Sequence, residues 1–361
     1  MKVALIHDWL LSEGGAEKVL EQLAHMFSAP IFTLLYDPVR LNNSFLSSQE
    51  IHTSFLQKLP FSHKIHRFLL PLFPYAIENI DVSFADVIIS SSHAVAKGIK
   101  KRKGQFHICY CHTPMRYAWD LKKEYIETLP KLTRPLASIL LERIRRWDKR
   151  SSCDVDLFIA NSSYVAKRIK NNYGRESTVI YPPVAVDDFF LSDQKEDYYI
   201  THCRLVPYKR VDLIIKTFAS MPSKKLIVVG EGPEKQRLER LASVNIQFTG
   251  FIPKKELSHL LSKAKAYVFA AEEDFGIAVI EAQASGLPVI ALEKGGAMET
   301  ISSGKTGLFF SEPTPLHCKQ AIERFEKIEN SFDKSYIRKQ ALSYSEERFK
   351  SDFFKALATA P

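Results

Sequence analysis

The stretch EDFGIAVIEAQASGLP, from Glu273 to Pro288, decides the fold. The compact apolar run just before it, residues 267–271, predicts a buried strand. Residues 277–285 favour a helix, which a Gly-Leu-Pro sequence ends, and a second apolar run follows at once. Glu273 is therefore expected at the carboxyl end of a strand and Glu281 inside the next helix. Ligands bind at the carboxyl ends of strands in open α/β sheets, so this stretch predicts a ligand site.

The composition bounds the class of protein. The chain has 361 residues, 45% of them apolar, which is enough for two domains with cores of their own. It has no apolar run long enough to span a membrane and too short an apolar N-terminus for a signal peptide, so we expect a cytoplasmic protein. The five cysteines include no CxxC pair, and we expect no disulfide framework. The net charge of +9 suits an anionic partner, but no nucleic-acid module is recognisable, and nucleic acid is not expected.

Strand and helix patterns alternate along both halves of the chain. The first half opens with an expected strand at 3–7, and the second half with one at 198–202. Between them, residues 181–197 combine paired prolines with acidic residues and predict a linker. This rhythm predicts parallel, doubly wound sheets. The expected fold class is therefore α/β, with two Rossmann-like domains that face a cleft.

The spacing Glu273-x7-Glu281 and the letters around it resemble the E-x7-E element of the retaining glycosyltransferases of family 4, which have the GT-B fold. The resemblance covers nearly the whole chain and is closest over 199–310. Taken alone, the pair could equally be a turn carboxylate and a solvated helix glutamate. A glycosidase pair is disfavoured, because eight residues of helix separate two carboxylates by roughly 12 Å.

The resemblance implies domain boundaries. In GT-B chains the last helix crosses back onto the first domain, and here a single helix is expected over roughly 333–358. The N-terminal domain, which binds the acceptor, would then comprise 1–186 and about 338–361. The C-terminal domain, which binds the nucleotide sugar, would comprise 187–337.

The resemblance also implies roles for individual residues. Glu273 would face the donor sugar, and Glu281 would hold the nucleotide ribose. His112, in the segment CHTPMRYAW, would contact the sugar, although a lone histidine is more often structural. The Gly14-Gly15 turn opens a helix and could bind an anion, or it could be a plain tight turn. The implied nucleotide-sugar site comprises Gly14, Gly15, Gly230, Gly232, Phe251, Phe275, Gly276, Ile277 and Glu281, and the GGAMETI segment that begins at Gly295 would offer further N–H groups.

Two cations complete the implied catalytic set of Glu273, Arg204, Lys209 and His112. Arg204 and Lys209 fit the family pattern R-L-x-x-x-K, although they could also be ordinary surface cations. Fixed cations aimed at a departing diphosphate stabilise the transition state more than the ground state. We therefore expect no metal requirement and no cofactor, and we discount the DxD triplet Asp154-Val155-Asp156, which precedes its strand.

The segments HDWL, ISSSHAVAKG and CHTPMRYAW together resemble bacterial mannosyltransferases of surface-polysaccharide assembly. GDP-mannose is the favoured donor and a polyprenyl-linked saccharide the favoured acceptor. The alternatives are a transferase or epimerase that uses a UDP-sugar, and a non-catalytic nucleotide-binding subunit. The run Lys97–Lys103 and the helix 143–150 are rich in cations, and HRFLLPLFPY lies in the same half. They predict contact with an anionic membrane at the inner face of the cell membrane, unless the basic face is merely solvated.

Overall fold

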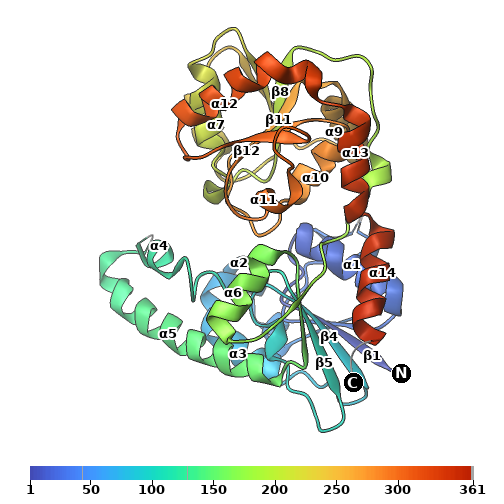
Figure 1. The fold of residues 1–361 in the computed structure, drawn as a ribbon. Coiled ribbons are helices and arrows are strands. Elements are labelled where there is room, and N and C mark those ends of the chain that lie inside the picture. Colours follow the sequence, from blue (N-terminus) through green and yellow to red (C-terminus); the bar gives the residue numbers. More distant parts are fainter. Residues whose placement is uncertain (43, 128, 359–361) are drawn as a thin grey trace. The chain divides into compact units, whose positions relative to one another are not determined.

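A computed structural model describes residues 1–42, 44–127 and 129–358, and these form two compact units (Figure 1). Unit 1 comprises Met1–Pro182 and the C-terminal segment from Lys350, and unit 2 comprises Pro183–Phe349. The division therefore falls slightly before the expected 186/187 boundary, and the chain returns to unit 1 later than residue 338. Positions 359–361 of the expected N-terminal domain lie outside the described residues.

Unit 1 contains a sheet of seven parallel strands in the order β3-β2-β1-β4-β5-β6-β7. This order places β1 beside β4, and the chain reverses its direction of winding between these two strands, which makes a topological switch point. The strands are β1 (Val3–His7), β2 (Ile31–Thr33), β3 (Ile51–Thr53), β4 (Val87–Ser92), β5 (Phe106–Cys111), β6 (Leu157–Ala160) and β7 (Thr178–Val179).

Helices cover the faces of this sheet. The helix after β1 buries Val19, Leu20 and Leu23 at helical spacing, as its sequence predicts. One helix continues past the sheet, and a short helix packs alongside its N-terminal half, as Figure 1 shows for α5 and α4. Lys122 Nζ of the short helix lies 3.2 Å from Glu142 Oε2 of the long one. The helices are α1 (Gly15–Phe27), α2 (Ser62–Ile65), α3 (Phe73–Glu78), α4 (Lys122–Glu127), α5 (Arg134–Ser151) and α6 (Ser163–Tyr173).

Unit 2 repeats the same architecture with six parallel strands in the order β10-β9-β8-β11-β12-β13. Its switch point lies between β8 and β11. The strands are β8 (Tyr198–His202), β9 (Lys225–Val229), β10 (Ile246–Gly250), β11 (Ala266–Phe269), β12 (Val289–Leu292) and β13 (Gly307–Phe310). The helices are α7 (Val211–Ala219), α8 (Lys235–Leu241), α9 (Lys254–Lys263), α10 (Ile277–Ala284), α11 (Ala297–Thr300), α12 (Pro315–Ile328) and α13 (Lys334–Ala341).

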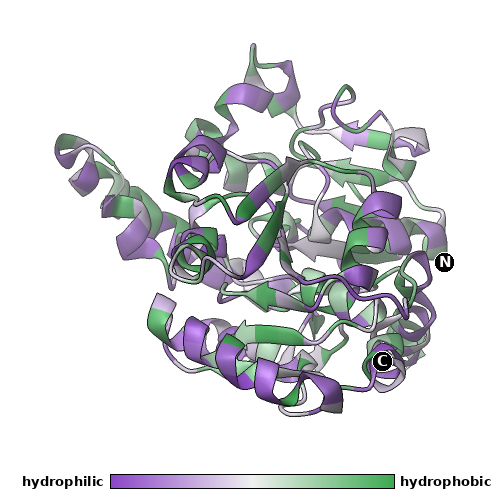
Figure 2. Cartoon of the chain, turned by 90° about the horizontal axis from the view of Figure 1, so that it is seen from above, coloured by the Kyte–Doolittle hydropathy of each residue, from purple (hydrophilic) through white to green (hydrophobic). Residues whose placement is uncertain are grey.

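The expectation of two Rossmann-like parallel-sheet domains is confirmed, and so is the strand–turn–helix reading of the decisive stretch. Figure 2 shows the cause in the hydropathy of the elements: the strands are largely green, while many helices alternate between green and purple. Strands buried on both faces are apolar throughout, and helices that cover them need only one apolar face. None of the helices in the described ranges is long and apolar enough to cross a membrane.

The expectation of one continuous C-terminal helix is wrong. The chain forms α13, a 3₁₀ turn, and then α14 (Glu346–Ala358). Ser345 between them is extended, and its hydroxyl accepts a hydrogen bond from Arg348 N (3.3 Å), as a helix N-cap does. The final turns of α14 do return to unit 1, where the ring centroid of Phe353 lies 5.9 Å from that of Phe27.

Candidate active site

The central contact in unit 2 is an ion pair between the Glu273 carboxylate and the Lys209 ammonium group. Glu273 lies in the loop between β11 and α10, and Lys209 ends a 3₁₀ turn that follows β8. Burial alone would lower the pKa of Lys209, but the adjacent Glu273 carboxylate outweighs it, and the pKa is raised. Lys209 is therefore cationic at neutral pH. The switch point of the sheet thus brings together two residues expected to act at the donor site.

Arg204 lies on the loop that follows β8, and its side chain is exposed. Within the described part of the chain, no hydrogen bond or ion pair holds its guanidinium group. The planar guanidinium group can bind two oxygens of one phosphate at the same time. Arg204 therefore differs from Lys209, whose charge is already matched by a carboxylate within the protein.

Glu281 lies on α10, where it is buried and bound to His202 at the end of β8. The distance from His202 Nε2 to Glu281 Oε2 is 2.8 Å. The Tyr267 hydroxyl donates to the carbonyl oxygen of His202 (3.0 Å), and burial raises the pKa of this tyrosine. Glu281 is therefore held by His202 of β8, which is held in turn by Tyr267 of β11. It is not the solvated helix glutamate of the alternative interpretation.

Two glycines after β12 support the Glu273 loop from beneath. Gly296 N donates to Glu273 O (2.8 Å), and a Cβ at Gly296 would lie 2.4 Å from the Cα of Phe275. A Cβ at Gly295 would lie 2.3 Å from Glu273 O. Gly276 has φ +91° where the loop enters α10, a conformation that favours glycine. The backbone carrying Glu273 is thus fixed by contacts that side chains would prevent.

A second glycine pair supports the Arg204 loop in the same way. A Cβ at Gly230 would lie 2.0 Å from Cys203 O, and one at Gly232 would lie 2.2 Å from Leu205 O. Leu205 N also donates to the carbonyl oxygen of Glu231 (2.8 Å). These glycines therefore position the Arg204 backbone, and their contact with a nucleotide stays a prediction.

The other predicted binding residues of unit 2 lie in different surroundings. Phe275 is buried, and its ring centroid lies 5.5 Å from that of Tyr344, so the ring anchors the loop. Phe251 is 80% exposed after β10, and Ile277 is partly exposed at the first turn of α10. Ile277 and Gly276 thus lie next to the Glu273 loop, whereas Phe251 offers a free aromatic surface.

In unit 1, His112 follows β5 and is buried near the switch point. Its Nε2 lies 2.8 Å from Ser91 Oγ, and the same hydroxyl lies 3.2 Å from His7 Nδ1. Burial, followed by the neighbouring His93 and His7, lowers the pKa of His112 well below its usual value. His112 is therefore neutral at pH 7, when it can donate or accept a hydrogen bond but supplies no charge.

Asp8 lies at the carboxyl end of β1 and is fully buried. Its carboxylate accepts hydrogen bonds from four successive backbone N–H groups, those of residues 93–96, at 2.5–2.9 Å. His93 Nδ1 also lies 3.0 Å from Asp8 Oδ2. A concave run of N–H groups is an anion site, and here a side chain of the protein fills it. The loop that carries His93 is consequently tied to β1.

Gly14 is the extended N-cap of α1, and Gly15 is the first residue of that helix. No side chain caps the helix start at Gly14. The first turn carries Glu17, whose Oε1 lies 3.6 Å from His7 Nε2. The glycine turn and the histidine cluster of unit 1 are therefore linked through Glu17, and anion binding at the turn stays a prediction.

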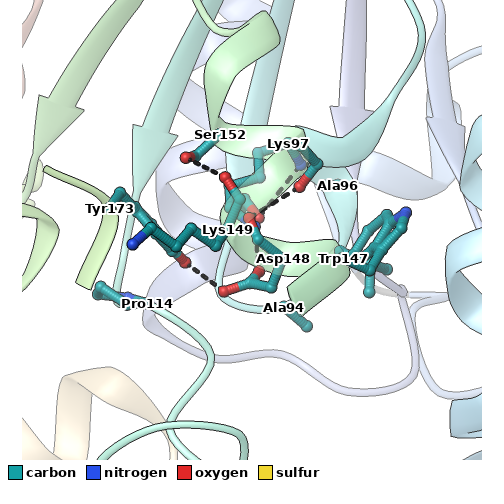
Figure 3. A network of polar contacts seen from close by, with 12 residues as sticks. Ala94, Ala96, Lys97, Pro114, Trp147, Asp148, Lys149, Ser152 and Tyr173 are labelled. Carbon is teal, nitrogen blue, oxygen red and sulfur yellow. Dashed lines mark hydrogen bonds and ion pairs between the residues drawn. The ribbon is translucent and has the colours of Figure 1, made fainter. Parts of the chain in front are cut away.

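The expectation that Lys97 belongs to an exposed basic face is wrong. Lys97 is 1% exposed and forms an ion pair with buried Asp148 of α5. Tyr173 OH and Trp119 Nε1 donate to the same carboxylate at 2.8 and 2.7 Å. Figure 3 shows Lys97 and Tyr173 converging on Asp148. Tertiary packing explains the error, because Gly98 allows Trp147 to approach so closely that a Cβ would lie 2.4 Å from the ring.

The remaining cations of that run are mostly paired at the surface. Lys100 lies 3.3 Å from Glu78, Lys101 lies 2.5 Å from Asp156, and Arg102 lies 3.6 Å from Asp81. Asp156 also accepts from His107 N (2.7 Å), so this end of the DxD triplet is occupied by protein groups. Among the described residues, no three potential metal ligands are grouped.

Sequence reasoning did not single out Asp8, His7, His93, Ser91 or His202. His7, Ser91 and His202 lie in the last two residues of their strands. Asp8 and His93 directly follow a strand end, and all of these strands border a switch point. The signal that could have found them is a polar residue at the carboxyl end of an otherwise apolar strand, as in ALIHD and VIISSSH. Asp8, His7, His93 and Ser91 lie near the switch point of unit 1, and His202 lies at that of unit 2, so the strand order of each sheet sets their neighbours.

Two family models match adjoining parts of the chain. Residues 13–188 match "Glycosyltransferase Family 4", and residues 187–341 match "Glycosyl transferases group 1". A "GDP-mannose-dependent monoacylated alpha-(1-6)-phosphatidylinositol monomannoside mannosyltransferase" of Corynebacterium glutamicum is 31% identical over 191 residues, which are 44% of this chain and 50% of that protein. A "GDP-mannose-dependent alpha-(1-6)-phosphatidylinositol monomannoside mannosyltransferase" of Mycolicibacterium smegmatis is 32% identical over 206 residues, 48% of this chain and 52% of that one. The chain spans about half the length of the curated relatives it matches.

Solved structures share the fold along the whole chain. Sucrose-phosphate synthase from Thermosynechococcus elongatus superposes with a TM-score of 0.76 at 17% identity and covers 100% of both chains. Anabaena HepE in complex with UDP gives a TM-score of 0.71 at 17% identity, covering 99% of this chain and 100% of that one. Taken with the two family models, the paired switch-point sheets lead to one conclusion: the chain belongs to glycosyltransferase family 4 and has the GT-B fold.

Proposed function

We propose that the chain is a retaining glycosyltransferase that transfers mannose from GDP-mannose to a saccharide acceptor. The observation that carries the proposal is the group of Lys209, Glu273 and Arg204 at the strand ends of unit 2. Arg204 is free to bind phosphate, and Lys209 is cationic. Two such cations stabilise the charge that develops on a departing diphosphate. Glu273 would face the donor sugar, as the family resemblance implies, and buried Glu281 would hold the ribose.

In this mechanism the leaving phosphate accepts the proton of the acceptor hydroxyl on the face from which it departs. The new bond then forms on the same face of the sugar as the old one, which is retention. Neutral His112 would position the sugar by a hydrogen bond, because its lowered pKa keeps it from acting as a cation. A transfer assay that yields a product of inverted anomeric configuration would contradict this scheme.

The choice of donor is supported by the relatives named GDP-mannose-dependent. A UDP-sugar is the second candidate, because the fold neighbour HepE was solved with UDP. A thermal-shift screen of GDP, GDP-mannose, UDP-glucose and UDP-N-acetylglucosamine separates the two. We expect stabilisation by the guanine nucleotides alone, since a ligand that binds only the native state raises the melting temperature. Stabilisation by uridine nucleotides alone would replace the donor in the proposal.

We propose that turnover needs no divalent metal, because Arg204 and Lys209 supply the positive charge. Activity should then survive EDTA. Complete loss on chelation with recovery in Mn²⁺ would return attention to the Asp154–Asp156 triplet.

We propose a lipid-linked acceptor, with a polyprenyl-linked saccharide of surface-polysaccharide assembly as its form. The enzyme would then work in the cytoplasm as a peripheral protein at the inner face of the cell membrane. Relatives named for phosphatidylinositol mannosides support an acceptor with a lipid part. Transfer of radiolabelled mannose into an organic-extractable product tests this. Label recovered only in water-soluble saccharides would contradict it.

A further inference from the structure

The segment 55–75 of unit 1, which follows β3 and ends in the first turn of α3, has two unlike faces. Its inner face packs into the core of the unit through Leu56, Leu69 and Phe73. Its outer face leaves large apolar side chains in solvent, among them Phe61 and Phe68, which are 68% and 84% exposed. The outer apolar residues are Phe55, Leu59, Phe61, Ile65, Phe68, Leu72 and Tyr75. More than half of the large apolar residues of this segment are thus exposed.

The segment is ordered by its own packing. It consists of short turns, including α2 (Ser62–Ile65) and the 3₁₀ turn His66–Leu72. The ring centroids of Phe55 and Tyr75, at opposite ends of the segment, lie 5.8 Å apart. The two ends of the segment are therefore held together, and we call its exposed apolar side chains the 55–75 face.

The charge of the 55–75 face has one sign. Residues 51–77 contain no Asp or Glu, but they contain Lys58, Lys64 and Arg67, all exposed. Within the described residues, none of these three cations forms an ion pair. Lys64 Nζ lies 5.8 Å from the centroid of the Phe61 ring. In this respect the face differs from the run Lys100–Arg102, whose cations are matched by acidic neighbours.

We propose that the 55–75 face docks on the surface of an anionic lipid bilayer. Aromatic and aliphatic side chains enter the boundary between headgroups and acyl chains, while unpaired cations beside them meet lipid phosphates. A second copy of the chain fits less well, because an isologous contact would set Lys58, Lys64 and Arg67 against themselves. The inference rests on the proposed function, in which the acceptor is lipid-linked. From the membrane contact that the sequence predicts it retains HRFLLPLFPY, extends this back to residue 55, and leaves out Lys97–Lys103.

The test is co-sedimentation of the full chain with vesicles. Binding should be strong on phosphatidylcholine mixed with phosphatidylglycerol, weak on phosphatidylcholine alone, and reduced by salt. The triple variant Lys58→Ala, Lys64→Ala, Arg67→Ala should weaken binding about a hundredfold, since each cation near the surface contributes about fivefold. The pair Phe61→Ser, Phe68→Ser should weaken it by at least about tenfold, because exposed rings lose their apolar contact.

Matched controls show whether the location is right. Lys100→Ala, Lys101→Ala, Arg102→Ala removes three cations that are already paired, and Leu132→Ser, Leu136→Ser removes two side chains that are 96% and 72% exposed elsewhere in unit 1. Both controls should bind vesicles like the parent. Equal losses in either control, or no vesicle binding by the parent at low salt, would overturn the proposal. All variants should keep the parent's melting temperature.

Failure here is separable from failure of the proposed function. Thermal shifts with GDP-mannose report on the donor site without lipid. A protein that binds GDP-mannose but no vesicles refutes only the 55–75 face. A protein that binds anionic vesicles but no nucleotide sugar refutes only the proposed transferase.

Discussion

Replacing Gly296 by alanine should damage the candidate site without touching any side chain in it. The added Cβ would lie 2.4 Å from the Cα of Phe275 and 2.5 Å from Asp274 O, both backbone atoms. Gly296 has φ −67°, so alanine adds no backbone strain of its own. Any loss of stability or turnover therefore comes from displacement of the Glu273 loop relative to the loop after β12.

The size of the effect follows from the overlap. Relieving it to an ordinary contact near 3.4 Å needs a shift of about 1 Å in one of two packed backbones. Overpacking of this kind costs about 1–3 kcal/mol of stability. A misplacement of about 1 Å at a catalytic group costs on the order of a hundredfold in turnover. The shift would also break the hydrogen bond from Gly296 N to Glu273 O.

Urea unfolding and mannose transfer from GDP-mannose measure the two effects on one preparation. Gly304→Ala is the matched control. Its Cβ would meet nothing within 4 Å, but its φ of +75° strains alanine, so it should lose about 1 kcal/mol with turnover intact. If Gly296→Ala keeps full turnover and parental stability, the backbone contact does not position Glu273. If Gly304→Ala loses as much turnover, the loss reflects stability alone.

Three further outcomes are expected. Arg204→Ala should lower turnover about a hundredfold, equivalent to about 3 kcal/mol, with an unchanged urea midpoint, because the side chain is exposed; parental turnover would remove it from the site. Asp148→Asn should cost about 3–5 kcal/mol in urea unfolding, because it leaves Lys97 buried without its counter-charge, and a loss below about 1 kcal/mol would contradict this. Burial, then Lys101, lowers the pKa of His107 to about 3, against 6.5 in the unfolded chain. The unfolded state therefore binds the proton first, and stability should fall as the pH drops from about 6.5 to 3, by up to about 1.4 kcal/mol per unit for this group. His107→Gln should flatten that slope, and an unchanged slope would refute the assignment.

Much of the fold could be predicted because hydrophobic periodicity is a local signal. The strand at 198–202 and the helix after Gly276 lie where the apolar patterns place them. The break at Ser345 was missed although it has a local signal: serine is a common helix N-cap, and Glu346 and Glu347 follow it in the first turn of α14. The extended backbone at Ser345 also pairs with Val184, and that distant partner has no local signal.

The candidate site was predictable where a motif names adjacent or regularly spaced residues. Glu273 and Lys209 carried such a motif, and the structure brings them into contact. Lys97 illustrates the limit. Among neighbouring lysines nothing in the sequence marks the one that is buried, since its partner Asp148 lies 51 residues away on a different helix. Most cations of the apparent basic patch 97–103 are neutralised by acidic partners in the folded protein, and composition alone cannot show this.

The carboxylate of Asp8 has a consequence for how substrates can be held. Four amide groups that point at one spot would attract any phosphate within reach, and Asp8 already occupies them. The N–H groups of the turn 93–96 therefore already have an acceptor within the protein, and they are not available to a nucleotide's diphosphate. An anionic ligand needs a different positively charged group, and the exposed guanidinium group of Arg204 is one that it could bind. In unit 1 this one anion site is filled by a carboxylate of the protein, whereas in unit 2 the guanidinium group of Arg204 is left open to an anion.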